Sequence, residues 1–245
     1  MKHQVVLLRV GIDAGCGGMQ GPLFQDGTFE LMCIPDKQAV SDHTYGSLTC
    51  KAGRSLTGYF PQSRRKVMGA QHVHIDPEFA TFTYGDPTTP KQSLSKLKPG
   101  DFLVFYCGLQ QWSEAEGWNA EHRPALYFAG YFEVARAGLA IAFTDDELRT
   151  EFGANFHVRH PSLFDEQKTR LVLVKGGAGS RVFRKAHQIS SKGFDKNGKP
   201  LKVLSPEMRK IFGDFSGVNS IQRSPPRWVD PEFVDGAIRY VTQLE

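Results

Sequence analysis

The sequence predicts an α+β fold in which a mixed or antiparallel sheet curls into a small barrel, with short helices and long loops around it. Three observations predict this class: short β-prone stretches recur along the chain, helical signals are few, and 25 glycines and 14 prolines are spread over all 245 residues. The chain shows no internal repeat and no low-complexity linker. We therefore expect one domain over residues 1–245, with the barrel at roughly 70–190 and two segments, 1–70 and 200–245, packed on it.

The first half of the chain carries mostly strand signals. Val5–Val10 is apolar and leads into a glycine-rich loop at Gly11–Gly21. Residues 36–70 are polar and contain several Gly and Pro, so we expect long loops there. Phe102–Cys107 is a run of large apolar residues, which is typical of a buried strand. The other stretches of this half are β-prone at Leu31–Ile34, His72–Ile75, Ala80–Tyr84 and Leu126–Ala135, with one helical turn at Leu94–Leu97.

The second half mixes helices and strands. Asp145–Phe152 favours a helix. Two later helices are predicted from a capping residue followed by proline, at Ser205-Pro206 and Asp230-Pro231. In the last of them, Glu232–Leu244, apolar residues recur at helical spacing and define one buried face. Strands are expected at Asn155–Val158 and Arg170–Lys175, and a short helix or strand at Arg181–Ala186.

The composition excludes several classes of protein. At 40% hydrophobic and 23% charged residues, the chain is neither disordered nor collagen-like. No apolar run approaches the roughly 18–20 residues that a membrane span needs. Met1–Val10 is too short for a signal peptide, and the four cysteines show no C-x-x-C spacing. We therefore expect a cytoplasmic protein with reduced thiols and no membrane contact.

The positive charge is concentrated in one segment. Residues 151–210 hold 13 Lys and Arg against 5 Asp and Glu, whereas residues 1–150 hold 14 against 16 and residues 211–245 hold 3 against 5. Local basicity of this kind indicates either a polyanionic partner or a solvated, lysine-rich loop. As DNA-backbone contacts we select Lys175, Arg181, Arg184 and Lys185 from a basic run that also includes His187, Lys192, Lys196, Lys199 and Lys202.

The glycine-rich loop is the first candidate for chemistry. It follows a strand, as a phosphate-binding loop would, but it lacks the Lys-Ser/Thr of a Walker loop. Gly17 and Gly18 allow a close backbone approach, and their N–H groups could hold a phosphate of DNA. Asp13 stands where the strand gives way to the loop, so its carboxylate is either directed into a cleft or caps a turn. Cys16 is a weaker candidate, as a nucleophile.

A second cluster of polar residues lies at His72-Val73-His74-Ile75-Asp76-Pro77. On a strand, His72, His74 and Asp76 would project to one face. That pattern permits a metal site or a hydrogen-bonded acid–base wall of an active site, and Asp-Pro is also an ordinary strand terminator. Asp86 repeats the Asp-Pro signal ten residues later. We select Asp76 and Asp86 as secondary catalytic candidates and expect no metal and no other cofactor. We assign His74 to a pocket that would hold a nucleic-acid base.

Two strands and the turn before them resemble a known superfamily. The turn Pro99-Gly100-Asp101, the strand ending in Tyr106 and the following strand Tyr127–Val134 are similar to the PUA-like superfamily, which includes the EVE and ASCH modules. Those modules are small β-barrels whose mouth holds a flipped or modified base. The resemblance implies a PUA-like barrel here, with its ligand at the mouth.

A closer resemblance covers most of the chain. The motifs that carry it are Gly11-Ile12-Asp13, Gly17-Gly18, Gly21-Pro22, His74–Phe79, Thr83–Asp86, Gly100-Asp101 and Phe105-Tyr106. As a set they resemble the third of the nucleotide-modification-associated domain families. That resemblance implies an association with modified DNA bases and with conflict between phage and host.

Aromatic residues complete the expected base pocket. Bases stack on aromatic side chains for about 1–3 kcal/mol each. Trp112 and Trp118 lie in a polar stretch and are therefore better candidates for ligand contact than the aromatic residues of the strands, most of which belong to the core. We add Tyr84 and Tyr106 to the expected pocket.

Together these features favour a DNA glycosylase that flips out and excises a modified base in anti-phage defence, and a glycosylated hydroxymethyl base of phage DNA is one candidate substrate. Asp13 would stabilise the oxocarbenium character that develops at C1′. The alternatives are a reader that binds a modified base in DNA or RNA without chemistry, and a nucleotide- or base-modifying transferase. The expected partner is double-stranded DNA with modified bases, and no protein partner is expected.

Overall fold

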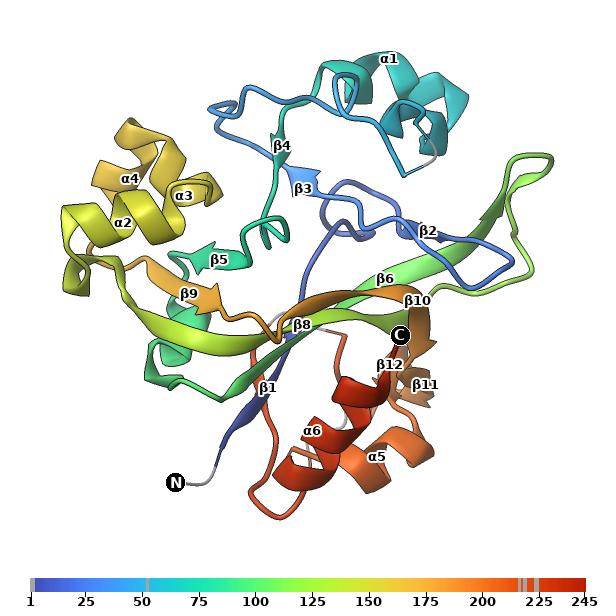
Figure 1. The fold of residues 1–245 in the computed structure, drawn as a ribbon. Coiled ribbons are helices and arrows are strands. Elements are labelled where there is room, and N and C mark those ends of the chain that lie inside the picture. Colours follow the sequence, from blue (N-terminus) through green and yellow to red (C-terminus); the bar gives the residue numbers. More distant parts are fainter. Residues whose placement is uncertain (1–2, 52, 216, 218–219, 223–224) are drawn as a thin grey trace.

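The computed structural model describes residues 3–51, 53–215, 217, 220–222 and 225–245. A large mixed sheet forms the centre of the molecule (Figure 1). Its strands follow the order β13-β1-β6-β8-β9-β5, and β2, β7 and β10 branch from this path. The bounds along the path are β13 Arg227–Trp228, β1 Val5–Arg9, β6 Phe102–Ser113, β8 Ala125–Leu139, β9 Val172–Gly176 and β5 Thr83–Asp86.

Most pairings in this sheet are antiparallel. The exceptions involve β6, which runs parallel to β1 and also to β2 (Gly21–Leu23). On its other edge β6 pairs antiparallel with β8 from Phe102 to Leu109, and with β7 (Gly117–Trp118) near its end. The long strand β8 pairs in turn with β9 and with β10 (Arg181–Gln188). The mixed sheet and the α+β class agree with the sequence prediction.

The described strands form no closed barrel. β13 and β5 end the strand path, and no pairing between described residues joins them. The register of β8 shifts between Val134 and Arg136 in its ladder with β9, and the register of β6 against β8 shifts between Phe105 and Tyr106. Such irregularities bend strands and let β8 pair with different partners along its length. The sequence predicts that the sheet closes into a barrel, whereas the sheet of the structure is open and branched.

Helices cover both faces of the sheet. In Figure 1, α1 (Gln62–Ala70) and the group α2–α4 lie on one side of the sheet, and α5 and α6 lie on the other. The group on the α1 side consists of α2 Asp145–Phe152, α3 Phe156–Arg159 and α4 Pro161–Gln167. The two helices on the opposite side are α5 Pro206–Phe212 and α6 Val234–Gln243. The 3₁₀ helices are η1 Leu56–Tyr59, η2 Thr89–Lys96 and η3 Ala140–Ala142.

Side-chain caps begin α2 and α5, and the second of them is the cap that the sequence predicts. Thr144 and Glu147 form a reciprocal capping box at the start of α2, and Ser205 accepts a hydrogen bond from the Met208 N–H at the start of α5, where Pro206 occupies the first turn. The Asp230-Pro231 signal lies a few residues too early, because α6 begins at Val234. No helix among the described residues is long and apolar enough to cross a membrane.

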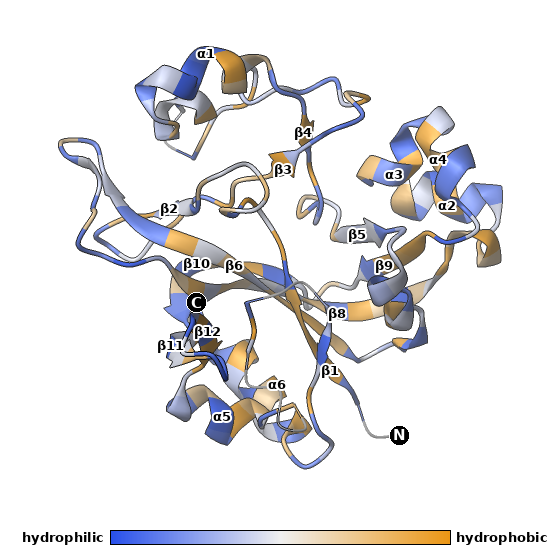
Figure 2. Ribbon diagram, turned by 180° about the vertical axis from the view of Figure 1, so that it is seen from behind, coloured by the Kyte–Doolittle hydropathy of each residue, from blue (hydrophilic) through white to orange (hydrophobic). Residues whose placement is uncertain are grey.

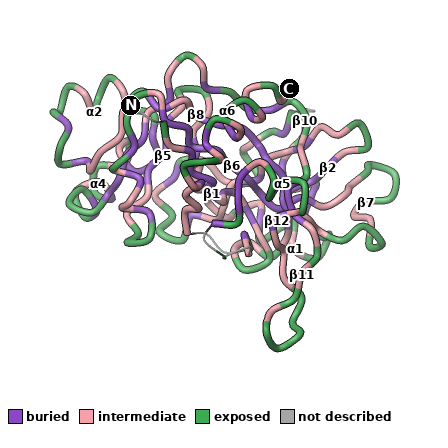
Figure 3. The backbone as a smooth tube through the Cα atoms, turned by 90° about the horizontal axis from the view of Figure 1, so that it is seen from below, coloured by how far each residue is buried: buried purple, intermediate pink, exposed green. Residues whose placement is uncertain are grey.

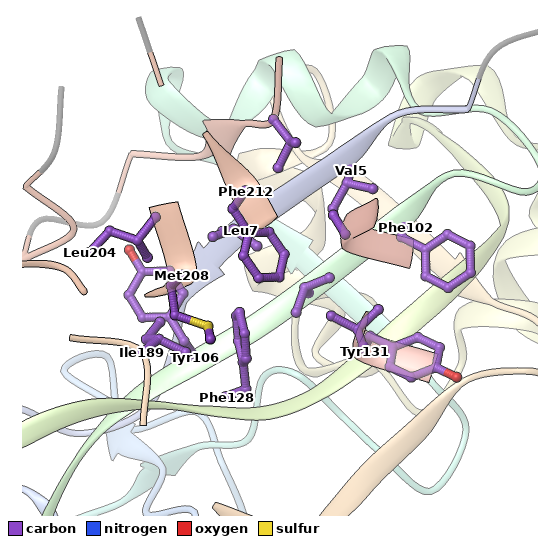
Figure 4. Close-up of a cluster of buried hydrophobic side chains, with 14 of the residues drawn as sticks. Val5, Leu7, Phe102, Tyr106, Phe128, Tyr131, Ile189, Leu204, Met208 and Phe212 are labelled. Carbon is purple, nitrogen blue, oxygen red and sulfur yellow. The ribbon is translucent and has the colours of Figure 1, made fainter. Parts of the chain in front are cut away.

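The two faces of the sheet build two hydrophobic cores. Val5 and Leu7 of β1 point to the core shared with α5 and α6, whereas Val6 and Leu8 point to the opposite core beneath η2. Figure 4 shows the first core, in which Tyr106, Phe128 and Phe212 gather beside β1. Figure 2 shows apolar stretches along the central strands, and Figure 3 shows that these strands are buried.

Some predicted elements are wrong. Residues 36–70 contain η1 and α1, because Gln62–Ala70 includes a run of good helix formers within the polar stretch. The expected strand Asn155–Val158 is instead the helix α3, whose N-cap is Asn155. The smaller strands form two separate pairs, β3 (Ile34–Pro35) with β4 (Val73–His74) and β11 (Ser190–Phe194) with β12 (Pro200–Leu204). β12 lies in a stretch where we expected no element.

Candidate functional site

The candidate site is a pocket of about 650 Å3 beside the glycine-rich loop. Its walls come from the end of β1, this loop, the start of β8 and the β11–β12 hairpin. Four cationic side chains and several amide and hydroxyl groups face it, and Asp13 is the one carboxylate among its described lining residues. The cations are Arg9, Arg123, Lys192 and Lys202, and the amides and hydroxyls belong to Gln20, Gln188, Gln222, Ser190 and Ser191.

Asp13 is held rigidly at the wall of this pocket. Its Oδ1 accepts hydrogen bonds from the backbone N–H groups of Gly15 and Cys16, each at 2.7 Å. Its Oδ2 lies 3.0 Å from Nη2 of Arg9, four residues earlier on β1. The Asp13 side chain is 26% exposed and that of Arg9 is 10% exposed, so the ion pair is partly shielded from water. The turn therefore both caps itself and presents a fixed negative charge to the pocket.

The glycines of the loop serve packing. Gly17 and Gly18 have φ values of +95° and +77°, which favour glycine. A Cβ on Gly17 would meet the Ile12 side chain, and a Cβ on Gly18 would lie 2.6 Å from Nη1 of Arg64. Arg64 of α1 also donates a hydrogen bond to the Gly17 carbonyl. The Arg64 side chain thus occupies the space beside these glycines, and Gly15 is the loop glycine that lines the pocket.

The pocket also contains a lysine with a shifted pKa and a closely packed amide. Burial lowers the pKa of Lys202, the neighbouring Arg9 lowers it further, and Asp13 opposes both. Gln20 is buried, and its Oε1 has no hydrogen-bond partner in the described structure. A Cβ on Gly108 would lie 1.8 Å from that oxygen, so this glycine gives the Gln20 amide its space. The thiol of Cys16 has its pKa raised by burial and by Asp13, which disfavours it as a nucleophile.

Asp76, the second catalytic candidate, lies outside this pocket. It belongs to a buried cluster with His74 and His157, whose ligand atoms all lie within 4.8 Å of one another. Asp76 Oδ2 accepts a hydrogen bond from the Gly85 N–H at 2.9 Å. Burial raises the pKa of Asp76 well above its ordinary value, and burial lowers the pKa of His74 to about 3, with His157 adding to the effect. His72, which we expected on the same face, instead places its Nδ1 2.6 Å from the Ser41 carbonyl oxygen.

Asp86, the third catalytic candidate, forms a partly buried ion pair. Its Oδ2 lies 3.3 Å from Nζ of Lys91 and accepts a hydrogen bond from the Tyr84 hydroxyl at 3.0 Å. Its Oδ1 accepts hydrogen bonds from the backbone and side chain of Thr88. Both carboxylate oxygens are thus occupied by protein donors, and Asp86 does not line the Asp13 pocket.

The aromatic residues expected in the base pocket lie elsewhere. Tyr106 is fully buried, and its hydroxyl donates to the Ile221 carbonyl. Tyr84 is buried beside Asp86. Trp112 packs edge-on against Tyr59, and Trp118 donates its indole N–H to the Tyr59 carbonyl. None of these residues, nor His74, lines the Asp13 pocket.

The four expected DNA-backbone cations lie outside this pocket too. Lys175 donates to the Thr81 carbonyl, and Arg184 pairs with Glu245 at 3.3 Å. Arg181 stands over the ring of Tyr131, and Lys185 lies beside Gly27. The basic run nevertheless reaches the pocket through its later members, Lys192 on β11 and Lys202 on β12.

Sequence reasoning missed several residues of both clusters. Arg9 carried a signal that could have been used, because a cation four residues before a loop carboxylate can fold back onto it. Gln20, Arg123 and Gln222 approach the pocket from three distant segments and carry no local pattern. His157 lies in a stretch for which the sequence predicts a strand and the structure has the helix α3. Its proximity to His74 therefore could not be predicted.

The fold and this pocket define a class: an α+β protein with an open, branched sheet and a cationic, amide-lined pocket around one fixed carboxylate. The family model for nucleotide modification associated domain 3 matches residues 4–241, and the chain belongs to that family. The membership confirms the closer of the two resemblances in the sequence. No curated protein and no solved structure gives a significant match.

Proposed function

We propose that the chain binds DNA through the Asp13 pocket and excises a modified base by hydrolysing its N-glycosidic bond. The observation that carries this proposal is one fixed carboxylate, the only one among the described lining residues, in a pocket that also presents four cations and several amides and hydroxyls. Membership of a nucleotide-modification family supports a role with modified nucleotides. The pocket volume of about 650 Å3 falls within the range of about 300–1,000 Å3 that is usual for small-ligand sites.

The proposed reaction breaks the bond between C1′ of the sugar and the base nitrogen, and water adds to C1′. The bonding electrons leave with the base, which takes up a proton, and the products are the free base and an abasic site. Positive charge develops at C1′ in the transition state. Asp13, fixed by two backbone N–H groups, would stabilise that charge without having to reorganise.

The remaining groups of the pocket suit a flipped nucleotide. Arg9, Arg123, Lys192 and Lys202 can neutralise flanking phosphates. Glutamine amides pair bidentately with base edges, and Gln20 brings an oxygen that has no partner within the described structure. Flipping costs a few kcal/mol of stacking, which these contacts must recover. A bulky modification, such as a glycosylated hydroxymethyl group on a phage base, would use the rest of the volume.

One observation favours a second function, that of a reader without catalysis. Both oxygens of Asp13 already have protein partners, two N–H groups on Oδ1 and Arg9 on Oδ2. A carboxylate held in this way can serve to fix the loop and Arg9 for binding. A reader of modified bases in DNA or RNA needs no more than this.

The direct test incubates the purified protein with phage DNA containing glycosylated hydroxymethylcytosine and, separately, with unmodified phage DNA. Mild alkali then converts abasic sites into breaks that a denaturing gel detects. We expect breaks in the modified DNA alone. Intact DNA that still shifts on a native gel, more for the modified substrate, would support the reader and contradict the glycosylase.

The salt dependence of binding tests which cations contact the backbone. Replacing Lys192, an exposed lysine at the pocket, by Ala should reduce the slope of log K against log salt concentration by about 1, because one fewer counterion is released. Lys168→Ala, at the C-terminal cap of α4 and away from the pocket, is the matched control and should leave the slope unchanged. Titrations by fluorescence anisotropy at several salt concentrations give both slopes. Equal slopes for wild type and Lys192→Ala would contradict a contact between this pocket and the DNA phosphates.

A further inference from the structure

A second polar cluster, separate from the Asp13 pocket, joins the β4–β5 segment to α3. His74 ends β4, Asp76 follows it in the connection to β5, and His157 belongs to α3. The Asp76 carboxylate oxygen Oδ2 lies 3.9 Å from Nε2 of His74 and 3.7 Å from Nε2 of His157. The side chains of Asp76 and His157 are 3% and 4% exposed. None of the three residues lines the Asp13 pocket.

Three buried polar atoms of this cluster have no hydrogen-bond partner in the described structure, whereas Asp76 Oδ2, which lies nearest both imidazoles, accepts from the Gly85 N–H. Nε2 of His74, Nε2 of His157 and Oδ1 of Asp76 are all buried and unpaired within the described structure. A buried polar atom without a partner is costly, and each residue of this cluster holds one. A ligand bound by both imidazole nitrogens and the carboxylate would satisfy them.

The surroundings of His157 determine which kind of partner fits. Its Nδ1 lies 2.7 Å from Oε1 of Gln167, an oxygen that can only accept a hydrogen bond. Nδ1 must then carry the proton, and Nε2 presents a lone pair to the Asp76 carboxylate. Two acceptors 3.7 Å apart with no proton between them repel each other, whereas a cation between them would bind both.

We infer that His74, Asp76 and His157 form a binding site for one divalent first-row transition-metal ion of the Zn²⁺ type. Two imidazoles with one carboxylate are a common ligand set for Zn²⁺ and Fe²⁺, whereas Mg²⁺ and Ca²⁺ prefer oxygen ligands alone. Tetrahedral ligands at about 2.0–2.1 Å from Zn²⁺ lie roughly 3.3–3.4 Å apart. The two separations between Asp76 and the imidazoles, 3.7 and 3.9 Å, would have to shorten by about half an ångström or less, and the three ligand atoms, which now lie within 4.8 Å of one another, would have to draw together by up to about 1.4 Å in all.

The neighbouring residues support the ligands as an outer shell would. Gln167 orients the His157 ring, and the Gly85 N–H holds Asp76. The ring of Phe156 stacks on that of His74 at 3.8 Å between centroids. A Cβ on Gly85 would lie 3.1 Å from Cδ2 of His157, so a glycine is needed for α3 to approach the carboxylate. The His74 side chain is 20% exposed, which makes it the most solvent-exposed of the three proposed ligands.

The test begins with wild-type protein that has been stripped by a chelator and dialysed. We expect it to take up one equivalent of Zn²⁺ by elemental analysis and to melt about 5–10 °C higher when free Zn²⁺ exceeds its Kd by about 100-fold. Co²⁺ in place of Zn²⁺ should give visible d–d absorption that Zn²⁺ abolishes. A stripped protein that takes up neither ion and melts unchanged would overturn the inference and leave a proton on Asp76.

Variants separate this site from adventitious binding at other histidines. His157→Gln and His74→Gln should each lose the bound equivalent and the Co²⁺ spectrum. His160→Gln, a neighbouring histidine outside the cluster, should keep both. Binding that survives in both cluster variants, or that disappears with His160→Gln alone, would contradict the assignment. If His157→Gln does not fold, the Co²⁺ spectrum of the wild type and the more exposed His74→Gln variant still decide the question.

Discussion

Replacing Asp13 by Asn is expected to slow abasic-site formation by about 10²–10⁴-fold, the range that charge stabilisation and acid–base groups contribute in enzymes. The change is conservative in geometry. Asn keeps the side-chain oxygen that accepts from Gly15 and Cys16, so the turn is preserved. It replaces the oxygen that faces Arg9 by an N–H₂ group and removes the negative charge that the oxocarbenium-like transition state requires.

The same substitution should leave DNA binding intact or make it slightly tighter, because Arg9 loses its counter-charge and faces the phosphates alone. Single-turnover rates on modified DNA and anisotropy titrations measure the two effects separately. Asp26→Asn is the matched control, since Asp26 also caps a turn, through Thr28, and does not line the Asp13 pocket. Full activity in Asp13→Asn would make Asp13 a structural residue and end the catalytic assignment.

The second large effect concerns stability. Replacing Lys91 by Met should lower the free energy of unfolding by about 3 kcal/mol, the lower end of the range for breaking a buried ion pair. The side chains of Lys91 and Asp86 are 7% and 18% exposed, and the Tyr84 hydroxyl contacts both. We choose the lower end because Asp86 keeps its two hydrogen bonds from Thr88 after the substitution. Urea unfolding at pH 7 measures the difference.

The pH dependence of this loss checks its cause. Burial by itself raises the pKa of Asp86, but Lys91 and Thr88 outweigh it and hold the pKa below 3.8. Stability from a lowered carboxyl pKa is present above the unfolded value and is lost as pH falls through the folded value. The difference between Lys91→Met and wild type should therefore shrink at acid pH. Lys96→Met, at the exposed end of the same helix, is the control, and equal losses in the two variants would refute the ion-pair explanation.

Local patterns predicted local structure well in this chain. The apolar runs of β1 and β6, the helix over Asp145–Phe152 and the Ser205-Pro206 start of α5 lie where the sequence predicts them. These signals depend on neighbours along the chain, such as an apolar period or a side chain that reaches an N–H three residues away. α3 was wrong because its four residues are too short to show a helical period, and its Asn155 cap was the one usable signal.

The candidate sites depended on contacts that no local pattern encodes. The sequence singles out Asp13 as a loop carboxylate at the end of a strand, and Asp13 lines a pocket together with Gln20, Arg123 and residues of the β11–β12 hairpin. Of the aromatic residues chosen for base stacking, Tyr84 and Tyr106 are buried in the core, because burial of large apolar side chains is favourable, and Trp112 and Trp118 are partly buried against a neighbouring apolar cluster. The sequence predicts that His72, His74 and Asp76 share one face of a strand. In the structure His72 lies outside this cluster, and His157, from a helix some 80 residues further along the chain, is the third residue beside His74 and Asp76.

The sequence by itself determined the α+β class, the central strands, the family to which the chain belongs and the carboxylate at the start of the glycine-rich loop. These follow from residue type and short-range spacing, which the unfolded chain already carries. Only the tertiary structure decided that the sheet branches and stays open, that the cations at the pocket are Arg9, Arg123, Lys192 and Lys202, and that His157 meets His74 and Asp76. Those outcomes depend on how two hydrophobic cores pack on opposite faces of one sheet, and packing brings together residues whose separation in sequence carries no signal.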